Sequence, residues 1–163
     1  MIMDKELSPQ QVFQKLATLC ARGEHCQHEM LEKMRKWGVD EPTQAQVMQR
    51  LVTERYVDDA RYAAAFVHDK VRYNHWGRRK VEQALWQKHI DEQTAQAALD
   101  EIDDSEYADM LRPLLKQKRR STSARNDYEL NVKLMKWALG RGFTMDVIRQ
   151  CLAVETDENE FLD

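Results

Sequence analysis

One seven-residue pattern sets the architecture of this chain: it occurs as Met34-Arg35-Lys36-Trp37-Gly38-Val39-Asp40, as Leu85-Trp86-Gln87-Lys88-His89-Ile90-Asp91 and as Ala138-Leu139-Gly140-Arg141-Gly142-Phe143-Thr144. Each copy starts with an apolar residue and has a second apolar residue five positions later. Gly or His precedes that second residue, and Asp or Thr, both good helix N-caps, follows it. The second apolar residues are 51 and 53 positions apart, which indicates an internal repeat.

Helical periodicity surrounds all three copies. Apolar residues recur at spacings of three and four, and nothing alternates long enough to predict a strand. Ser8-Pro9-Gln10-Gln11 is a strong helix start, because Ser8 can cap and Pro9 suits the first helical position. The predicted helices cover about residues 9–22, 26–37, 42–55, 58–73, 78–88, 92–102, 106–119, 125–139 and 145–153.

We therefore predict an all-α protein made of three tandem three-helix repeats in an elongated, curved array. The repeats are predicted at residues 8–55, 58–103 and 105–153, and residues 154–163 form an acidic C-terminal tail. Each repeat is too small to bury much apolar surface alone, so we expect neighbouring repeats to share core contacts. Pro113 conflicts with its helical surroundings and predicts either a kink or a helix that begins near Arg112.

The composition limits the class of protein. The chain has 163 residues, 42% of them hydrophobic and 33% charged, with 5 Gly and 3 Pro, which is typical of a helical soluble protein. No apolar run approaches the ~20 residues of a membrane span, and no signal-like segment opens the chain. Three cysteines, an odd number, argue against a disulfide framework. We expect a cytoplasmic, monomeric protein with no membrane partner.

Charge is strongly segregated, although the net charge is only −3. Residues 61–89 hold seven basic and two acidic residues, residues 91–109 hold eight acidic and no basic ones, and residues 112–125 hold six basic and no acidic ones. The basic blocks could contact phosphates or an acidic protein surface. The alternative is a set of ordinary solvated helix faces with internal salt bridges.

Nine of the thirteen bases in these two blocks are the candidate binding residues, for DNA or for a protein assembled on it: Lys70, Arg72, Arg78, Arg79, Lys80, Lys118, Arg119, Arg120 and Arg125. The group at 78–80 ranks first, because three bases at a helix start oppose the helix dipole and so suggest a function. The group at 118–120 ends a helix, where bases are favoured. Trp76 beside these bases could stack on single-stranded bases, but packing is the favoured interpretation for Trp76 and for Trp137.

No catalytic or cofactor motif is present in the sequence. It has no GxxxxGK, GxGxxG, HExxH or paired CxxC pattern. The Cys and His residues at positions 20, 25, 26 and 28 lie too close together for a structural zinc site. The Asp58-Asp59 pair is better explained by helix capping than by acid–base chemistry. We expect a protein that is not an enzyme and that has no metal or other cofactor.

The central segment contains the motif Tyr56-Val57-Asp58-Asp59-Ala60-Arg61-Tyr62-Ala63, followed by Gly77-Arg78-Arg79-Lys80-Val81 and by Lys88-His89-Ile90. In this order the motifs resemble the RecX family of recombinase regulators. His89 stands where the family usually has glycine, and Cys26 where it tends to have a capping serine. The flanking Gly38-Val39 and Arg141-Gly142-Phe143 are similar to the first and last units of the family.

The resemblance implies a non-enzymatic, three-repeat helical protein that binds the RecA recombinase and its filament on single-stranded DNA. Such proteins limit filament extension, ATP hydrolysis and strand exchange, and so modulate recombination, DNA repair and the SOS response. The basic blocks would then face DNA or the filament groove. Two alternatives stay open. One is a general nucleic-acid-binding helical module that binds DNA directly, without a recombinase partner, and the other is a protein–protein scaffold whose charge blocks pair with each other.

Overall fold

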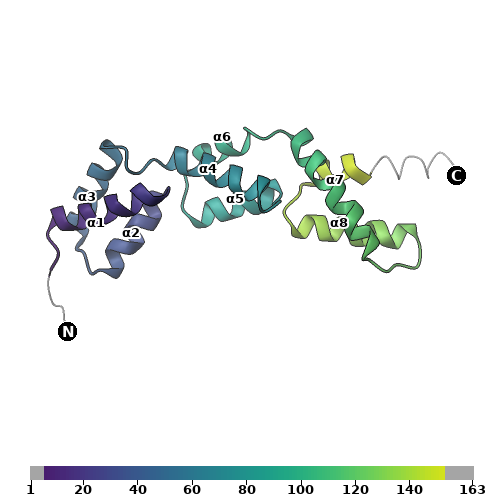
Figure 1. Ribbon diagram of the computed structural model, residues 1–163, viewed down its shortest axis with the longest axis horizontal. Coiled ribbons are helices and arrows are strands. Elements are labelled where there is room, and N and C mark those ends of the chain that lie inside the picture. The colour runs from purple at the N-terminus through teal and green to yellow at the C-terminus, as the bar shows by residue number, and fades with distance from the viewer. Residues whose placement is uncertain (1–5, 153–163) are drawn as a thin grey trace. The chain divides into compact units, whose positions relative to one another are not determined.

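The computed structural model describes residues 6–152, and in this range it contains helices and no strand. The all-α prediction is therefore confirmed. The helices are α1 (Pro9–Arg22), α2 (Gln27–Lys36), α3 (Glu41–Thr53), α4 (Asp59–Arg72), α5 (Arg78–Gln87), α6 (Glu92–Leu99), α7 (Asp104–Arg120) and α8 (Asp127–Gly140), and residues 145–152 are also helical (Figure 1). None of the helices within residues 6–152 is both long and apolar enough to span a bilayer. The predicted acidic tail, 154–163, lies outside the described residues.

The repeated seven-residue pattern forms the same helix end three times. Gly38, His89 and Gly142 all adopt positive φ, at 73°, 57° and 97°. The next amide in each copy donates to the carbonyl five residues earlier: Val39 to Met34 at 2.9 Å, Ile90 to Leu85 at 3.2 Å and Phe143 to Ala138 at 3.1 Å. This is the hydrogen bonding of a Schellman motif, which favours glycine at the left-handed position. His89 adopts the left-handed conformation without being glycine.

Several of the predicted side-chain caps are present. The capping box at the start of α1 is confirmed, with Gln11 N donating to Ser8 Oγ at 3.2 Å and Ser8 N to Gln11 Oε1 at 2.9 Å. Asp58 caps α4, since its Oδ1 accepts from the amides of Ala60 and Arg61. The prediction for Asp40 is wrong in one respect: it is the N-cap of α3, but its side chain makes no cap hydrogen bond.

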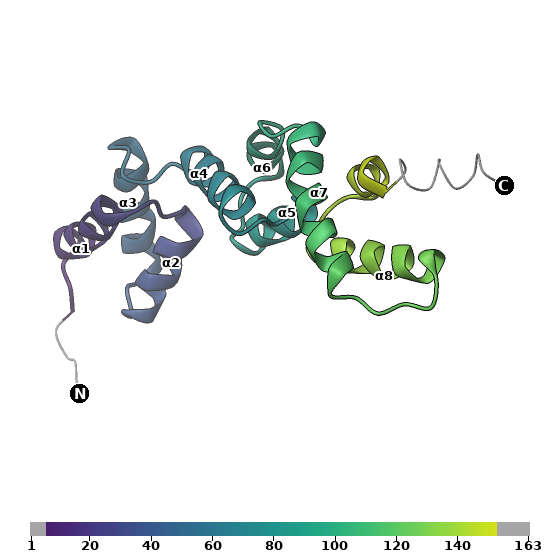
Figure 2. The same ribbon diagram turned by 45° about the vertical axis from the view of Figure 1, so that its right-hand side comes forward.

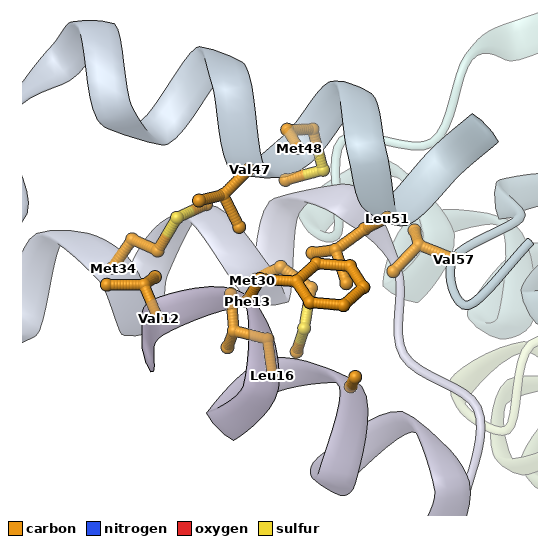
Figure 3. Close-up of a cluster of buried hydrophobic side chains, with 10 residues drawn as sticks. Val12, Phe13, Leu16, Met30, Met34, Val47, Met48, Leu51 and Val57 are labelled. Carbon is orange, nitrogen blue, oxygen red and sulfur yellow. The ribbon is translucent and has the colours of Figure 1, made fainter. Parts of the chain in front are cut away.

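The described chain divides into two compact units. The first unit comprises residues 6–66 and 85–95, and the second comprises residues 67–84 and 96–152. In the first unit, α3 packs against both α1 and α2. Figure 3 shows their buried side chains meeting around Phe13 and Leu16, with Met30 and Met34 filling the space between the helices. The cluster is Val12, Phe13, Leu16, Ala17, Met30, Met34, Val47, Met48, Leu51 and Val57.

In the second unit, α7 and α8 lie side by side (Figure 2). Tyr107 of α7 meets Phe143 edge to face, with ring centroids 6.5 Å apart, and both side chains are buried. The final helical segment packs on α7, because Cys151 Sγ donates to the carbonyl of Ala108 at 3.4 Å. These contacts bring the chain after α8 back onto α7.

Pro113 lies inside an unbroken helix. Helix α7 starts at Asp104, where Asp103 accepts the Glu106 amide at 3.0 Å, so a helix start near Arg112 is wrong. Pro113 and Asp109, whose carbonyl loses its helical donor, are both exposed. The solvent side of the helix tolerates the proline because water can bind the carbonyl that the helix leaves free.

Replacing Pro113 with alanine should therefore stabilise the protein. Alanine restores the missing hydrogen bond and removes the ring, which is worth up to about 3 kcal/mol in a helix interior. Urea unfolding followed by circular dichroism measures the change. A Pro113→Ala protein less stable than the parent would show that the proline is required by the local packing.

Candidate nucleic-acid interface

A backbone junction joins the turn before α5 to the end of α8, and both lie in the second unit. The amide of Gly77 donates to the carbonyl of Arg141 at 2.9 Å, and the amide of Arg79 donates to the carbonyl of Gly142 at 2.8 Å. The Arg141 guanidinium adds a third link, since its Nη2 donates to the carbonyl of Asn74 at 3.2 Å. The junction connects residues more than sixty positions apart in the sequence.

Both glycines of this junction are required by the closeness of the two backbones. A Cβ on Gly77 would collide with backbone atoms of Gly142 and Phe143. A Cβ on Gly142 would collide with the Cβ and amide nitrogen of Lys80, and Gly142 also has a φ of 97°. The glycine before the basic helix and the glycine of Arg141-Gly142-Phe143, recognised separately in the sequence, are therefore two halves of one contact.

Trp76, in the turn that makes this junction, lies beside two lysines. The ammonium of Lys80 is 4.6 Å from the centroid of the Trp76 ring, and that of Lys70 is 5.1 Å from it. Trp76 is half-buried. Cation–π attraction at these distances stabilises the positions of the two cations. Trp76 thus both packs in the turn and holds the bases that the sequence placed near it.

Trp137 of α8 repeats this arrangement on the other side of the junction. The ammonium of Lys118 is 5.7 Å from the Trp137 centroid, and the Arg141 guanidinium carbon is 5.3 Å from it. Because Arg141 also bonds the turn that carries Trp76, the two cation–tryptophan groups are neighbours. We call this surface the tryptophan–cation surface, comprising Lys70, Trp76, Lys80, Lys118, Trp137 and Arg141.

The other predicted binding residues have different surroundings. Three arginines have carboxylate partners: Arg72 with Glu106 at 3.2 Å, Arg78 with Asp100 at 2.7 Å, and Arg125 with Glu129 at 2.9 Å. Arg119 donates to Asn131 at 3.3 Å. Arg79 and Arg120 are exposed. The structure therefore brings Lys70 and Lys80 together over Trp76 and places Lys118 over Trp137. Arg72, Arg78 and Arg125 are instead engaged within the protein.

These ion pairs explain part of the charge segregation. The acidic block at 91–109 supplies Asp100 and Glu106 to the basic block at 61–89, as the alternative of internal salt bridges requires. Arg78 also donates to Gln96 at 2.7 Å. The charge of Arg78 also acts on Tyr107: burial raises the pKa of the Tyr107 hydroxyl to about 12, and the positive charge of Arg78 opposes this rise. The dipole argument for Arg78 as a binding residue is thus weakened, because acidic partners compensate its charge.

Two of the Cys and His residues near α2, His25 and Cys26, join a polar network around Glu29 in the first unit. Glu29 accepts from Lys88 at 3.1 Å and from the Cys26 amide at 3.1 Å, and it lies 3.3 Å from His25. Burial acts to raise the pKa of Glu29, but these hydrogen bonds outweigh it and hold the pKa below its usual value. Burial raises the pKa of the Cys26 thiol to about 11, which keeps the sulfur neutral. Within residues 6–152, no three His, Cys, Asp or Glu side chains converge as metal ligands.

Arg141 is the main residue of the surface that the sequence analysis missed as a binding candidate. It lies outside the basic blocks, and nothing local marks it as a neighbour of Trp76. Its signal was the motif Arg141-Gly142-Phe143, which the sequence analysis noted only as a family feature. The pairing of Lys118 with Trp137 was also missed, because it joins α7 to α8.

The fold and this surface define a class of protein. It is all-α, the same motif ends several of its helices, and it carries a basic surface that contains two half-buried tryptophans. Two family models match the chain, the RecX second three-helix domain over residues 58–99 and the RecX third three-helix domain over residues 104–152. The chain belongs to the RecX family.

Relatives that are similar over most of this chain carry the name regulatory protein RecX. The one from Acinetobacter baylyi is 29% identical over 147 residues, which are 90% of this chain and 89% of that protein. The one from Halalkalibacterium halodurans is 27% identical over 136 residues, 82% of this chain, and this chain spans about half the length of that relative. The crystal structure of RecX from Lactobacillus salivarius has the same fold, with a TM-score of 0.81 at 18% identity, covering 89% of this chain and 94% of that one.

The junction predicts that Gly77→Ala destabilises the protein by more than about 2 kcal/mol, because the added methyl group must displace the backbone of the facing segment. Gly140→Ala is the matched control, because Gly140 is in α8 and nothing lies within 4 Å of its added Cβ. Alanine at this helical position should stabilise the protein by up to about 1 kcal/mol. Urea unfolding of both variants tests this. Equal stabilities would contradict the close approach at Gly77.

The neighbouring arginines should also differ. Arg78→Gln removes the bonds to Asp100 and Gln96 and should lower the unfolding free energy by about 1 kcal/mol, a modest value because Asp100 is largely exposed. Arg79→Gln changes an exposed side chain and should stay within about 0.5 kcal/mol of the parent. Chemical denaturation distinguishes the two, and a larger loss for Arg79→Gln would reverse the assignment.

Proposed function

We propose that this protein is a cytoplasmic, largely monomeric regulator that binds RecA and the RecA filament on single-stranded DNA. It inhibits filament extension, ATP hydrolysis and strand exchange, and so modulates recombination and DNA repair. It acts by binding rather than by catalysis. The observation that carries this proposal is membership of the RecX family over residues 58–152.

The structure supports a binding role through its basic surface. The tryptophan–cation surface gathers positive charge from both basic blocks, which suits a partner rich in phosphate.

We also propose that the chain is divided into three repeats, at residues 8–55, 58–103 and 105–153. The recurring Schellman motifs at Gly38, His89 and Gly142 support it, because each ends a helix at the same place in a predicted repeat.

A general nucleic-acid-binding module without a recombinase partner is the second candidate. The basic surface with its two tryptophans favours it, since such a surface needs no recombinase to attract a nucleic acid. The two candidates differ in what they need. A RecA regulator changes a RecA reaction at concentrations near those of RecA, whereas a module that only covers DNA must saturate the strand first.

The proposal predicts that the protein slows ATP hydrolysis by RecA on single-stranded DNA. RecA from the same source is assembled on the DNA, and the protein is titrated well below the concentration that would cover the strand. Steady-state hydrolysis should fall progressively, because blocked filament extension leaves fewer active subunits. An unchanged rate at stoichiometric excess of folded protein would refute the regulator function. Inhibition seen only when the strand is saturated would favour the general module.

A further inference from the structure

We propose that Lys80 and Lys118 of the tryptophan–cation surface bind the phosphodiester backbone of single-stranded nucleic acid, with Trp76 and Trp137 holding them in place. This inference deepens the proposed function, on which it rests, by naming the contact residues and their ligand. It selects these residues from a larger set of bases because of the way each cation is held.

The first step is the availability of the hydrogen-bond donors. A lysine over an aromatic ring is held by the ring's quadrupole and keeps its three N–H donors for another partner. Lys80 and Lys118 are held in this way, and neither forms an ion pair with a carboxylate among residues 6–152. The arginines at 72, 78 and 125 instead spend donors on Glu106, Asp100 and Glu129. A phosphate would have to displace those carboxylates.

The second step is the arrangement of the cations. The backbone junction at Gly77 and Gly142 fixes the turn that carries Trp76 against the end of α8 that carries Trp137. Arg141 belongs to both sides, since it lies over Trp137 and bonds the carbonyl of Asn74. Arg141 thus links the two tryptophans, and the lysines that these tryptophans hold lie on a supported surface rather than on mobile side chains. A polymer with regularly spaced negative charges can contact them together.

The third step favours single-stranded nucleic acid over an acidic protein. Trp76 and Trp137 are half-buried and already hold cations over their rings, but Tyr73, in the same turn as Trp76, is 79% exposed. A strand with unstacked bases offers phosphates to the lysines and a base face to the exposed Tyr73 ring. Carboxylates of an acidic protein would use the cations alone. Duplex bases are stacked on each other and offer no free face.

The test measures fluorescence anisotropy of a labelled 20-nucleotide oligothymidylate at several salt concentrations. The variant is Lys80→Gln with Lys118→Gln. The matched control is Lys15→Gln with Lys36→Gln, which removes the same charge from the first unit and includes Lys15, a lysine 5.2 Å from the centroid of the Trp37 ring. A third protein, Lys80→Arg with Lys118→Arg, keeps the charge. All four substituted side chains are at least partly exposed, so the variants should fold, and circular dichroism checks this.

We expect the Lys80→Gln/Lys118→Gln protein to bind the oligothymidylate about 30-fold more weakly, at roughly 1 kcal/mol for each lost contact. Its plot of log affinity against log salt should be flatter by about 1.4, because each single-strand phosphate contact contributes about 0.7 to the slope. The Lys15→Gln/Lys36→Gln protein and the arginine variant should bind nearly as the parent does.

Three results would overturn this inference. The first is equal loss of affinity in the variant and the Lys15→Gln/Lys36→Gln control, which would indicate a net-charge effect. The second is unchanged oligothymidylate affinity with weakened binding to RecA in the absence of DNA, which would assign the surface to an acidic protein. The third is a parent protein that does not bind the oligothymidylate but still slows RecA hydrolysis. In that third case the proposed regulator function stands and only the nucleic-acid contact fails.

Discussion

The candidate site depends on one contact, the close approach of the backbones at Gly77 and Gly142. Two amide-to-carbonyl hydrogen bonds cross it, and neither glycine has room for a methyl group. The contact fixes the turn that holds Trp76 against the segment that holds Arg141. Lys80 lies over Trp76 on one side of this contact, and Lys118 lies over Trp137 on the other side.

Much of the fold could be predicted because its determinants are local. Ser8 caps α1 and Asp58 caps α4 through atoms within three residues of the cap. The three Schellman motifs close within six residues, so the pattern at Gly38 and Gly142 is readable in the sequence. His89 shows that the pattern outweighs residue preference: the position adopts a φ of 57° even without glycine, and its ring stacks on His28 with centroids 3.9 Å apart.

The site could be predicted only in part, because its determinants are distant in sequence. Composition identified the basic blocks but could not separate Arg78, paired with Asp100, from Lys80, held over Trp76. That distinction depends on which helices face each other. The helix-dipole argument favoured Arg78 as a binding residue, but the structure pairs Arg78 with Asp100. Arg141 was missed because the turn whose carbonyl it bonds, at Asn74, lies more than sixty residues earlier. The unbroken helix through Pro113 could not be predicted from the sequence. The solvent exposure of Pro113, which makes the proline tolerable, depends on how the helices pack.

The most direct test of the central contact is a double-mutant cycle on the unfolding free energy with Gly77→Ala and Gly142→Ala. If the two residues form one junction, the first substitution already breaks it. The second should then cost at least about 1 kcal/mol less than it does alone. Gly38→Ala is the control partner, since Gly38 also has positive φ but nothing lies within 4 Å of its added Cβ. Its cost should add to that of Gly77→Ala. Additivity within about 0.5 kcal/mol for Gly77 with Gly142 would contradict the account.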